Sequence, residues 1–202
     1  MRVIAGTARS IPLKAPQGMT TRPTTDKIKE TLFNMIQFDV QGAVFLDLFA
    51  GSGAMGIEAL SRGAEYAVFV DSGKAAADCI RANLEKCRFM DRSRIVRADA
   101  ASFSAYLPLP DRKEGEKLII FMDPPYEKGM EIPVLEGLAE RGVLDGNCLV
   151  ILEEGLGFDT ETLARTGLEI SRIKQYKNQQ HIFLRNGATR NERNDLALPG
   201  QF

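Results

Sequence analysis

Two short motifs combine polar groups with unusual backbone. Asp123-Pro124-Pro125-Tyr126 follows the apolar run LIIFM. Because two prolines fix the backbone, the Asp123 carboxylate and the Pro124 carbonyl can form a paired acceptor for an amine N–H₂. Tyr126 supplies a flat face on which a base can stack. This motif indicates a pocket that holds an aromatic ring bearing an amino group.

The second motif, Gly51-x-Gly53-x-x-Gly56, predicts a loop that binds a nucleoside cofactor. Glycines let a ligand approach the backbone closely, and the N-terminus of the following helix offers free N–H groups. Asp71 follows the last glycine by 15 residues and is placed to accept hydrogen bonds from ribose hydroxyls. NAD and S-adenosylmethionine both use such loops, and close packing of a strand on a helix favours the same glycines. The motif alone does not choose among them.

Two further acids favour S-adenosylmethionine. Asp47 precedes the glycine loop, where it would repel a pyrophosphate and attract the ammonium group of a methionine. Asp99 ends a later strand and can accept a hydrogen bond from an adenine amino group. Each acid alone is also a common strand-end or turn residue. Together with Asp71, they fit a ligand with a ribose, an adenine and a cationic amino-acid end.

Alternating strands and helices must position these groups. Apolar runs predict strands at 43–49, 67–71, 94–99, 118–123 and 148–153, and helices at 26–37, 53–62, 74–86, 100–106, 134–141 and 160–165. Two final strands, 168–176 and 179–185, have no helix between them and predict an antiparallel edge hairpin. We expect an α/β fold with a doubly wound, mostly parallel sheet of seven strands and a small N-terminal extension. The carboxyl ends of four successive strands bring their aspartates to one edge.

Composition predicts an ordinary globular domain. The chain has 202 residues and a formal net charge of −1, which excludes a strongly basic protein that coats nucleic acid indiscriminately. Its three cysteines lack CxxC spacing and His181 is the only histidine, so we expect no disulfide framework, no metal and no Ser-His-Asp triad. The start lacks the pattern of a signal peptide, and no stretch approaches the roughly 18 apolar residues of a membrane helix. A cytoplasmic monomer that does not contact a membrane is expected.

Four segments together resemble one family, the RsmD guanine-N2 methyltransferases of small-subunit ribosomal RNA. They are RVIAG near the start, TRPTTDKIKETLFN at 21–34, LDLFAGSGAMGIEALSRGA at 46–64 and FMDPPY at 121–126. The resemblance extends from about Arg2 to Arg185. It implies a Rossmann-like class I methyltransferase fold, S-adenosylmethionine as cofactor, and small-subunit ribosomal RNA as partner, either free or within the subunit.

The resemblance also implies site residues. Those expected to bind the cofactor are Asp47, Phe49, Gly51, Gly53, Asp71 and Asp99, and those of the catalytic motif are Asp123, Pro124, Pro125 and Tyr126. Asp71 stands where the family often has Glu.

The expected domains are an arm and helix at 1–37, a methyltransferase domain at 38–185 and a polar tail at 186–202. The first part carries six Lys and Arg against two acids, which gives +4 and leaves −5 on the remainder. This basic arm is the candidate RNA contact, with Arg9, Lys14 and Arg22 as its binding residues. Ordinary solvated charges are the alternative.

Three other functions remain open on the sequence. An adenine-N6 or protein-glutamine methyltransferase shares the pocket, although glutamine enzymes commonly carry Asn-Pro-Pro-Tyr. An NAD-dependent oxidoreductase uses the same glycines. A ribosome-assembly factor that binds RNA without catalysis is the option outside enzymes, and the acids at four strand ends argue against it.

Overall fold

Strands and helices alternate along the chain. The computed structural model describes residues 1–16, 25–125 and 128–187. Its strands are β1 (Val44–Leu48), β2 (Tyr66–Asp71), β3 (Ser93–Arg97), β4 (Leu118–Met122), β5 (Cys148–Gly155), β6 (Leu168–Gln175) and β7 (Gln179–Asn186). Its α-helices are α1 (Asp26–Met35), α2 (Gln37–Val40), α3 (Ala54–Ser61), α4 (Lys74–Cys87) and α5 (Glu131–Glu140), and its 3₁₀ turns are η1 (Met90–Arg92), η2 (Phe103–Ala105) and η3 (Thr160–Thr166).

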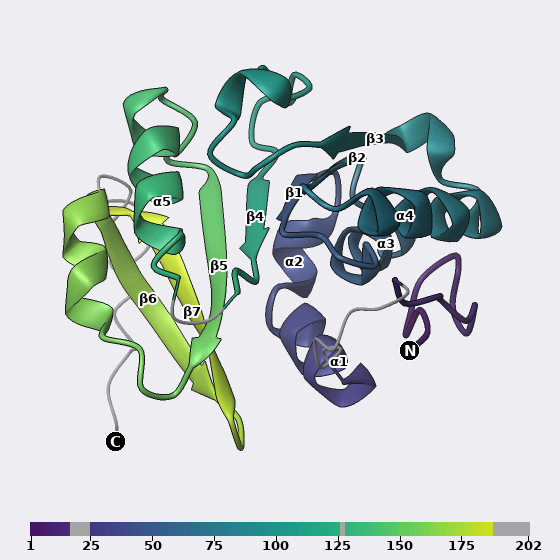
Figure 1. Cartoon of the computed structure of the whole chain (residues 1–202), viewed down its shortest axis with the longest axis horizontal. Helices are drawn as coiled ribbons and strands as arrows, with labels where there is room; N and C mark the ends of the chain where they lie inside the picture. Colours follow the sequence, from purple (N-terminus) through teal and green to yellow (C-terminus); the bar gives the residue numbers. More distant parts are fainter. Residues whose placement is uncertain (17–24, 126–127, 188–202) are drawn as a thin grey trace, which may run out of the picture.

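The seven strands form one sheet in the order β3-β2-β1-β4-β5-β7-β6 (Figure 1). The first five strands are parallel, while β7 pairs antiparallel with β5 and β6 pairs antiparallel with β7. The strand order reverses between β1 and β4, where an open α/β sheet forms a crevice at the carboxyl ends of its strands. The predicted sheet and its edge hairpin are confirmed.

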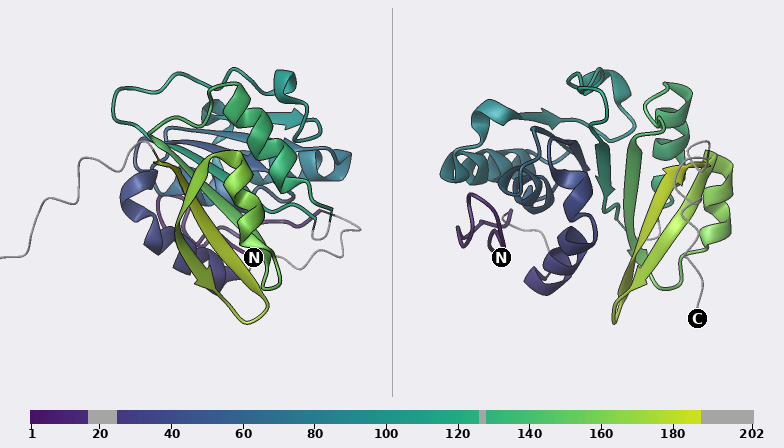
Figure 2. Two further views of the ribbon diagram at one scale, coloured as in Figure 1. Left: turned by 90° about the vertical axis from the view of Figure 1, so that its left-hand side faces the viewer. Right: turned by 180° about the vertical axis from the view of Figure 1, so that it is seen from behind.

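Helices cover both faces of the sheet, as the views in Figure 2 show. Neighbouring residues of a strand point to opposite faces. Phe45 of β1 therefore belongs to the core beneath α1 to α4, and Leu46 belongs to the core beneath α5, η2 and η3. The fold is doubly wound.

Two of the expected helices differ from the observed elements. The helix expected at 26–37 breaks at Ile36 into α1 and α2, and the second piece brings Asp39 to Arg185 of β7 at 3.2 Å. The helix expected from Val134 begins earlier, at Glu131. Pro133 fits there because the first turn of a helix needs no N–H from that position.

The segment 100–106, expected as a helix, forms only the η2 turn. The buried Tyr106 hydroxyl donates to the Ala100 carbonyl at 2.6 Å. Arg94 donates to the Tyr106 carbonyl and to the Pro108 carbonyl. A side chain thus occupies the Ala100 carbonyl, and Pro108 and Pro110, which have no N–H, prevent the turn from continuing as a helix. The segment 160–165, also expected as a helix, forms the 3₁₀ turn η3.

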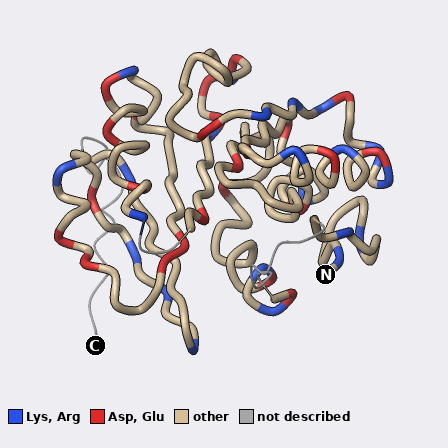
Figure 3. Tube along the Cα trace, viewed as in Figure 1, with Lys and Arg blue, Asp and Glu red and all other residues tan. Residues whose placement is uncertain are grey.

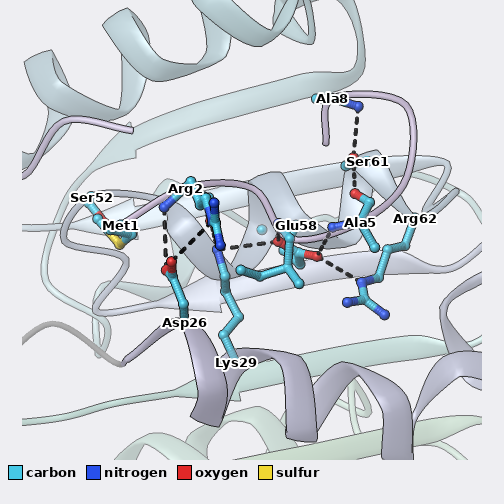
Figure 4. A network of polar contacts seen from close by, with 12 residues as sticks. Met1, Arg2, Ala5, Ala8, Asp26, Lys29, Ser52, Glu58, Ser61 and Arg62 are labelled. Carbon is cyan, nitrogen blue, oxygen red and sulfur yellow. Dashed lines mark hydrogen bonds and ion pairs between the residues drawn. The ribbon is translucent and has the colours of Figure 1, made fainter. Parts of the chain in front are cut away.

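The N-terminal segment folds back as a small hairpin, with an antiparallel bridge between Arg2 and Pro12. It is fastened to α3 through the fully buried Glu58 (Figure 4). The two Glu58 carboxylate oxygens accept hydrogen bonds from the Ile4 and Ala5 amides at 2.7 and 3.0 Å. The segment is therefore docked on the domain rather than a free arm.

Two cations complete this network. The Lys29 ammonium lies 3.2 Å from Glu58 and donates to the Arg2 carbonyl at 2.7 Å, and Arg62 lies 2.8 Å from Glu58. Burial lowers the pKa of Lys29, whereas the charge of Glu58 opposes that change. At the end of α3, an added Cβ on Gly6 would meet the Ser61 carbonyl oxygen at 1.8 Å, so this turn of the hairpin requires glycine.

Within the described ranges, no helix is both long and apolar enough to cross a bilayer.

Candidate active site

The acids at the carboxyl edge follow from the register of the parallel strands. Asp47 of β1 stands opposite Phe69 of β2 and Phe121 of β4, all on the face beneath α1 to α4. Two residues further along each strand, the same face carries Asp71 after Phe69 and Asp123 after Phe121. One face of the sheet therefore directs three predicted acids toward a common edge.

The three glycines of the loop serve different purposes. Gly51 has φ +53°, and an added Cβ would have no neighbour nearer than 4.0 Å, so its backbone conformation, rather than crowding, favours glycine. Gly53 caps α3 with φ +73° and packs on Phe69 and Ile80. An added Cβ on Gly56 would lie 2.4 Å from the Phe69 ring. Close packing therefore accounts for Gly53 and Gly56, while Gly51 lines the cavity described below.

Asp71 holds the loop in place. One carboxylate oxygen accepts from the Gly51 amide at 2.9 Å, and the other accepts from the Gly73 amide at 2.8 Å. The side chain thus ties the loop after β1 to the loop after β2. Because a carboxylate has about four acceptor positions, room remains for ribose hydroxyls.

Asp47 is the most buried of the predicted acids, with 2% of its surface exposed. It accepts from the Gly56 amide at 3.0 Å. Burial and the charge of Asp71 nevertheless raise the pKa of Asp47 to about 8, against the opposing effect of that hydrogen bond. The side chain is a desolvated acid that a cationic group would stabilise in its ionised form.

Asp123 and Pro124 directly follow β4. Among the described residues, no group donates to the Asp123 carboxylate or to the Pro124 carbonyl. Burial raises the pKa of Asp123 well above its usual range, and the charges of Glu153, Asp47 and Glu154 raise it further. Pro125 is exposed beside them. Tyr126 lies outside the described residues.

These residues line a cavity of about 600 Å³ at the carboxyl edge of the sheet. Of the residues expected at the site, it contains Asp47, Phe49, Gly51, Asp71, Asp99, Asp123, Pro124 and Pro125. Gly53 is buried behind the loop and does not line it. Phe49 has φ +62°, a conformation that costs a non-glycine residue roughly 1–2 kcal/mol.

The cavity also has walls that the motifs do not predict. Met1, Ala15 and Pro16 of the N-terminal segment line it, as do Asn178 of the β6–β7 turn and Gln179 at the start of β7. The sequence gives no local signal for these contacts, since docking of the N-terminal hairpin depends on the buried Glu58.

A buried Glu–His pair adjoins Asp123 and was missing from the sequence prediction. Glu153 of β5 lines the cavity, and its carboxylate lies 2.9 Å from Nε2 of His181, which is fully buried. The Tyr176 hydroxyl lies 3.2 Å from His181 Nδ1, and the Gln179 amide donates to Glu153. The alternation of the strand CLVILE places Glu153 on the face of Leu149 and Ile151, a signal that could have predicted it.

The proposed RNA contacts at the N-terminus are only partly within the described residues. Arg9 and Lys14 are exposed, while Arg22 lies outside the described residues. The basic surface is smaller than the count of +4 indicates, because Lys29 is buried against Glu58 and Arg2 pairs with Asp26 at 3.4 Å.

Charge distinguishes this cavity from a larger one. Acidic residues gather where β4 and β5 end (Figure 3). Within the described chain, none of the four predicted aspartates forms an ion pair with Lys or Arg. A cavity of about 970 Å³ lies near the opposite ends of β4 and β5, and two of its four acids, Asp145 and Glu116, are paired with Arg112 and Lys113. The desolvated acids Asp47 and Asp123 make the smaller cavity the candidate active site.

No group of three or more His, Cys, Asp or Glu side chains within residues 1–16, 25–125 and 128–187 is arranged to hold a metal ion.

Comparisons with known proteins identify a family. Residues 1–185 match the family model described as conserved hypothetical protein 95. The chain is 40% identical over 153 residues to YlbH of Bacillus subtilis, covering 76% of this chain and 82% of that protein. It is 35% identical over 153 residues to the protein named ribosomal RNA small subunit methyltransferase D of Escherichia coli K12, covering 76% of this chain and 74% of the relative.

A solved structure supports the same relationship. The yhhF protein of Escherichia coli superposes with a TM-score of 0.77 at 30% identity, covering 92% of this chain and 97% of that one. These matches show that the chain belongs to the RsmD family of ribosomal RNA methyltransferases.

Proposed function

We propose that this protein transfers a methyl group from S-adenosylmethionine to the exocyclic N2 amine of a guanine in small-subunit ribosomal RNA. The observation that supports it most strongly is that Asp123 and Pro124, to which no described residue donates, share one cavity with Asp47, Asp71 and Asp99. Relatives named as methyltransferases of small-subunit ribosomal RNA indicate the substrate class.

The residues present suit S-adenosylmethionine. The volume of about 600 Å³ falls within the roughly 300–1,000 Å³ of small-molecule sites. Asp47 and its acidic neighbours favour a cation over a pyrophosphate. Gly51 leaves the wall of the cavity open, and Asp71 and Asp99 offer acceptors for a ribose and an adenine amino group.

The cofactor would supply a methyl group bonded to a positively charged sulfur. The sulfur would be the leaving group and would become a neutral thioether. The protein must prepare the nucleophile, since the N2 lone pair of guanine is delocalised into the ring. The Asp123 carboxylate and the Pro124 carbonyl each accept one N–H of the amine, which localises the lone pair and orients it. On methylation N2 loses one proton, and an Asp123 oxygen is placed to accept it. Catalysis then rests on positioning and electrostatics.

The base must leave its stack to reach this pocket, and Tyr126 is proposed as the face on which it stacks. Asp47, Phe49, Gly51, Gly53, Asp71 and Asp99 are proposed to hold the cofactor, with Gly53 acting through the shape of the loop.

Incubation with labelled S-adenosylmethionine tests the proposal. Ribosomal RNA and unmodified small subunits are offered separately and digested to nucleosides. Label in N2-methylguanosine is the expected result. Label in N6-methyladenosine or in protein contradicts it, as does binding of a nicotinamide cofactor without methyl transfer.

A further inference from the structure

The acidic pocket around Asp123 contains one carboxylate that the proposed chemistry does not use. Glu153 lies on β5, the strand next to β4. Met122 stands opposite Leu152 in the parallel register, so the next residues, Asp123 and Glu153, come opposite each other. Neighbouring strands lie about 4.8 Å apart. Two carboxylates therefore face one cavity from adjacent strands.

Glu153 is held in a defined orientation although only 3% of its surface is exposed. His181 Nε2 lies 2.9 Å from one carboxylate oxygen, and the Gln179 amide donates to the other. His181 Nδ1 lies 3.2 Å from the Tyr176 hydroxyl, so both ring nitrogens of His181 have partners. Each Glu153 oxygen keeps a further acceptor position. A carboxylate held this way acts as a fixed acceptor.

Two adjacent acceptors discriminate among the nucleobases. On its Watson–Crick edge, guanine presents N1–H beside N2–H₂, so donors occupy two neighbouring positions. Adenine and cytosine present one amino group beside an unprotonated ring nitrogen, which would turn a lone pair toward the second carboxylate. Enzymes read a flipped base through this edge. A site built to bind a donor rejects analogues that lack it, because its own buried acceptor is left unpaired.

We propose that Glu153 is the residue that selects guanine, by accepting N1–H while Asp123 and Pro124 hold the N2 amine. Tyr176, His181 and Gln179 act as positioning residues for Glu153. This inference rests on the proposed function and adds to it the reason why the pocket takes guanine.

The neighbouring Glu154 provides a matched control. It is also buried on β5, but it points to the opposite face, accepts from the Gly155 amide at 3.3 Å and does not line the cavity. Glu153→Gln and Glu154→Gln therefore make the same substitution at adjacent positions on opposite faces of β5.

The test uses an RNA fragment that the wild-type protein methylates, bound to protein loaded with S-adenosylhomocysteine. The target guanine is replaced by 2-aminopurine, which keeps the amine but has an acceptor at N1, or by hypoxanthine, which keeps N1–H but lacks the amine. We expect Glu153→Gln to lower the affinity for the guanine fragment at least tenfold. Its affinity for the 2-aminopurine fragment should not fall. The same variant should also bind the hypoxanthine fragment more weakly than the wild type does, because hypoxanthine keeps N1–H. Glu154→Gln, whose charge reaches Asp123 although its side chain does not line the cavity, should change the affinities for the guanine and 2-aminopurine fragments by equal factors.

Folding and the conservative variant are measured in parallel. Glu153→Asp keeps the charge and should retain part of the preference for guanine over 2-aminopurine. Unchanged binding of S-adenosylhomocysteine by Glu153→Gln shows that the cavity is intact. If Glu153→Gln weakens guanine and 2-aminopurine equally, or weakens neither, the inference is wrong.

The nucleoside that the wild-type protein labels with S-adenosylmethionine distinguishes failure of this inference from failure of the proposed function. If label appears on guanine N2 and Glu153→Gln keeps full discrimination, only the role of Glu153 fails. If the wild-type label appears on adenine N6, both fail, because a Glu153 carboxylate would then face the adenine N1 lone pair.

Discussion

Asp123 is the residue on which the chemistry depends most. Asp123→Ala removes one of two acceptors for the amine, and we expect a rate loss of roughly 10²–10³, comparable to loss of one oriented group in an oxyanion hole. Binding of S-adenosylhomocysteine, measured by calorimetry, should not change. Asp123→Asn keeps one acceptor oxygen and should lose less. A variant that loses cofactor affinity would place Asp123 in the cofactor site instead.

The raised pKa of Asp47 leads us to expect that cofactor affinity depends on pH. Burial raises its pKa to about 8, so below pH 8 the carboxyl is mainly neutral. Because a cationic amino-acid group binds the ionised form, binding below pH 8 must release a proton. Affinity for S-adenosylhomocysteine should rise with pH from 6 to 8, by at most about tenfold per unit.

The proton release of Asp47 can be isolated. Calorimetry in buffers of different ionisation enthalpy measures it directly, and Asp47→Asn should abolish the part that Asp47 contributes. Persistence of the full pH dependence in Asp47→Asn would assign it to another titratable group of the cavity. The same pKa shift makes the ionised Asp47 destabilising, so its contribution to folding stability falls as pH rises from about 4 to 8.

Residue types and spacing predicted the acids at the strand ends but not how each is used. Asp47 and Asp71 could be placed from the strands that precede them. Their amide partners, Gly56 and Gly51, depend on loop conformation. The pair of Glu153 and His181 joins antiparallel strands 28 positions apart in the chain, and it becomes visible only with the register of β5 on β7.

At the scale of elements, Gly56 governs how closely α3 packs on β2. Alanine at this position would favour the helix by about 1 kcal/mol on propensity alone. Its Cβ would lie 2.4 Å from the buried Phe69 ring, and overpacking costs roughly 1–3 kcal/mol. We expect Gly56→Ala to lower the free energy of unfolding in urea.

A double-mutant cycle checks the cause. Phe69→Leu removes the atoms that clash, so Gly56→Ala should cost less in that background than in the wild type, with coupling of about 1 kcal/mol or more. Gly51→Ala is the control, because its Cβ would have no neighbour nearer than 4.0 Å, and it should not couple with Phe69. Additive effects of Gly56→Ala and Phe69→Leu would contradict the packing role of Gly56.

Glu58 links the N-terminal hairpin to the domain. Glu58→Ala leaves Lys29 buried without its carboxylate partner, and loss of one member of a buried pair costs roughly 3–5 kcal/mol. It also frees the Ile4 and Ala5 amides, so trypsin should cleave after Arg9 faster than in the wild type. Glu85→Ala, an exposed acid on α4, should change neither the unfolding midpoint nor cleavage. Slow cleavage in Glu58→Ala would show that other contacts suffice for docking.

The strands were predictable because each is a short apolar run between turn signals, and their boundaries agree with the structure to within two residues. The errors fall on helices whose ends are set by tertiary contacts. The segment 100–106 has helical composition, yet the buried Tyr106 hydroxyl and Arg94 take its carbonyls. No local pattern reveals such partners.

At the scale of the molecule, a net charge of −1 separates into an acidic cavity and exposed cations around it. Arg9 and Lys14 are exposed on the N-terminal hairpin, and Ala15 and Pro16, which follow Lys14, line the cavity. The acids repel phosphates and the cations attract them. RNA can therefore approach with its backbone on the rim while a single base enters the pocket.

This arrangement predicts a modest dependence of RNA affinity on salt. If Arg9 and Lys14 each contact one phosphate, replacing both with Ala should reduce the slope of log affinity against log salt by about 1.4–1.8. Arg88→Gln is the control. The loop before α4 lines the cavity, whereas Arg88 stands at the far end of this helix, about 21 Å from its first residue. Fluorescence anisotropy with an rRNA fragment at several salt concentrations measures the slope. An unchanged slope in the Arg9→Ala, Lys14→Ala variant would move the RNA contact to other cations around the cavity, such as Lys128.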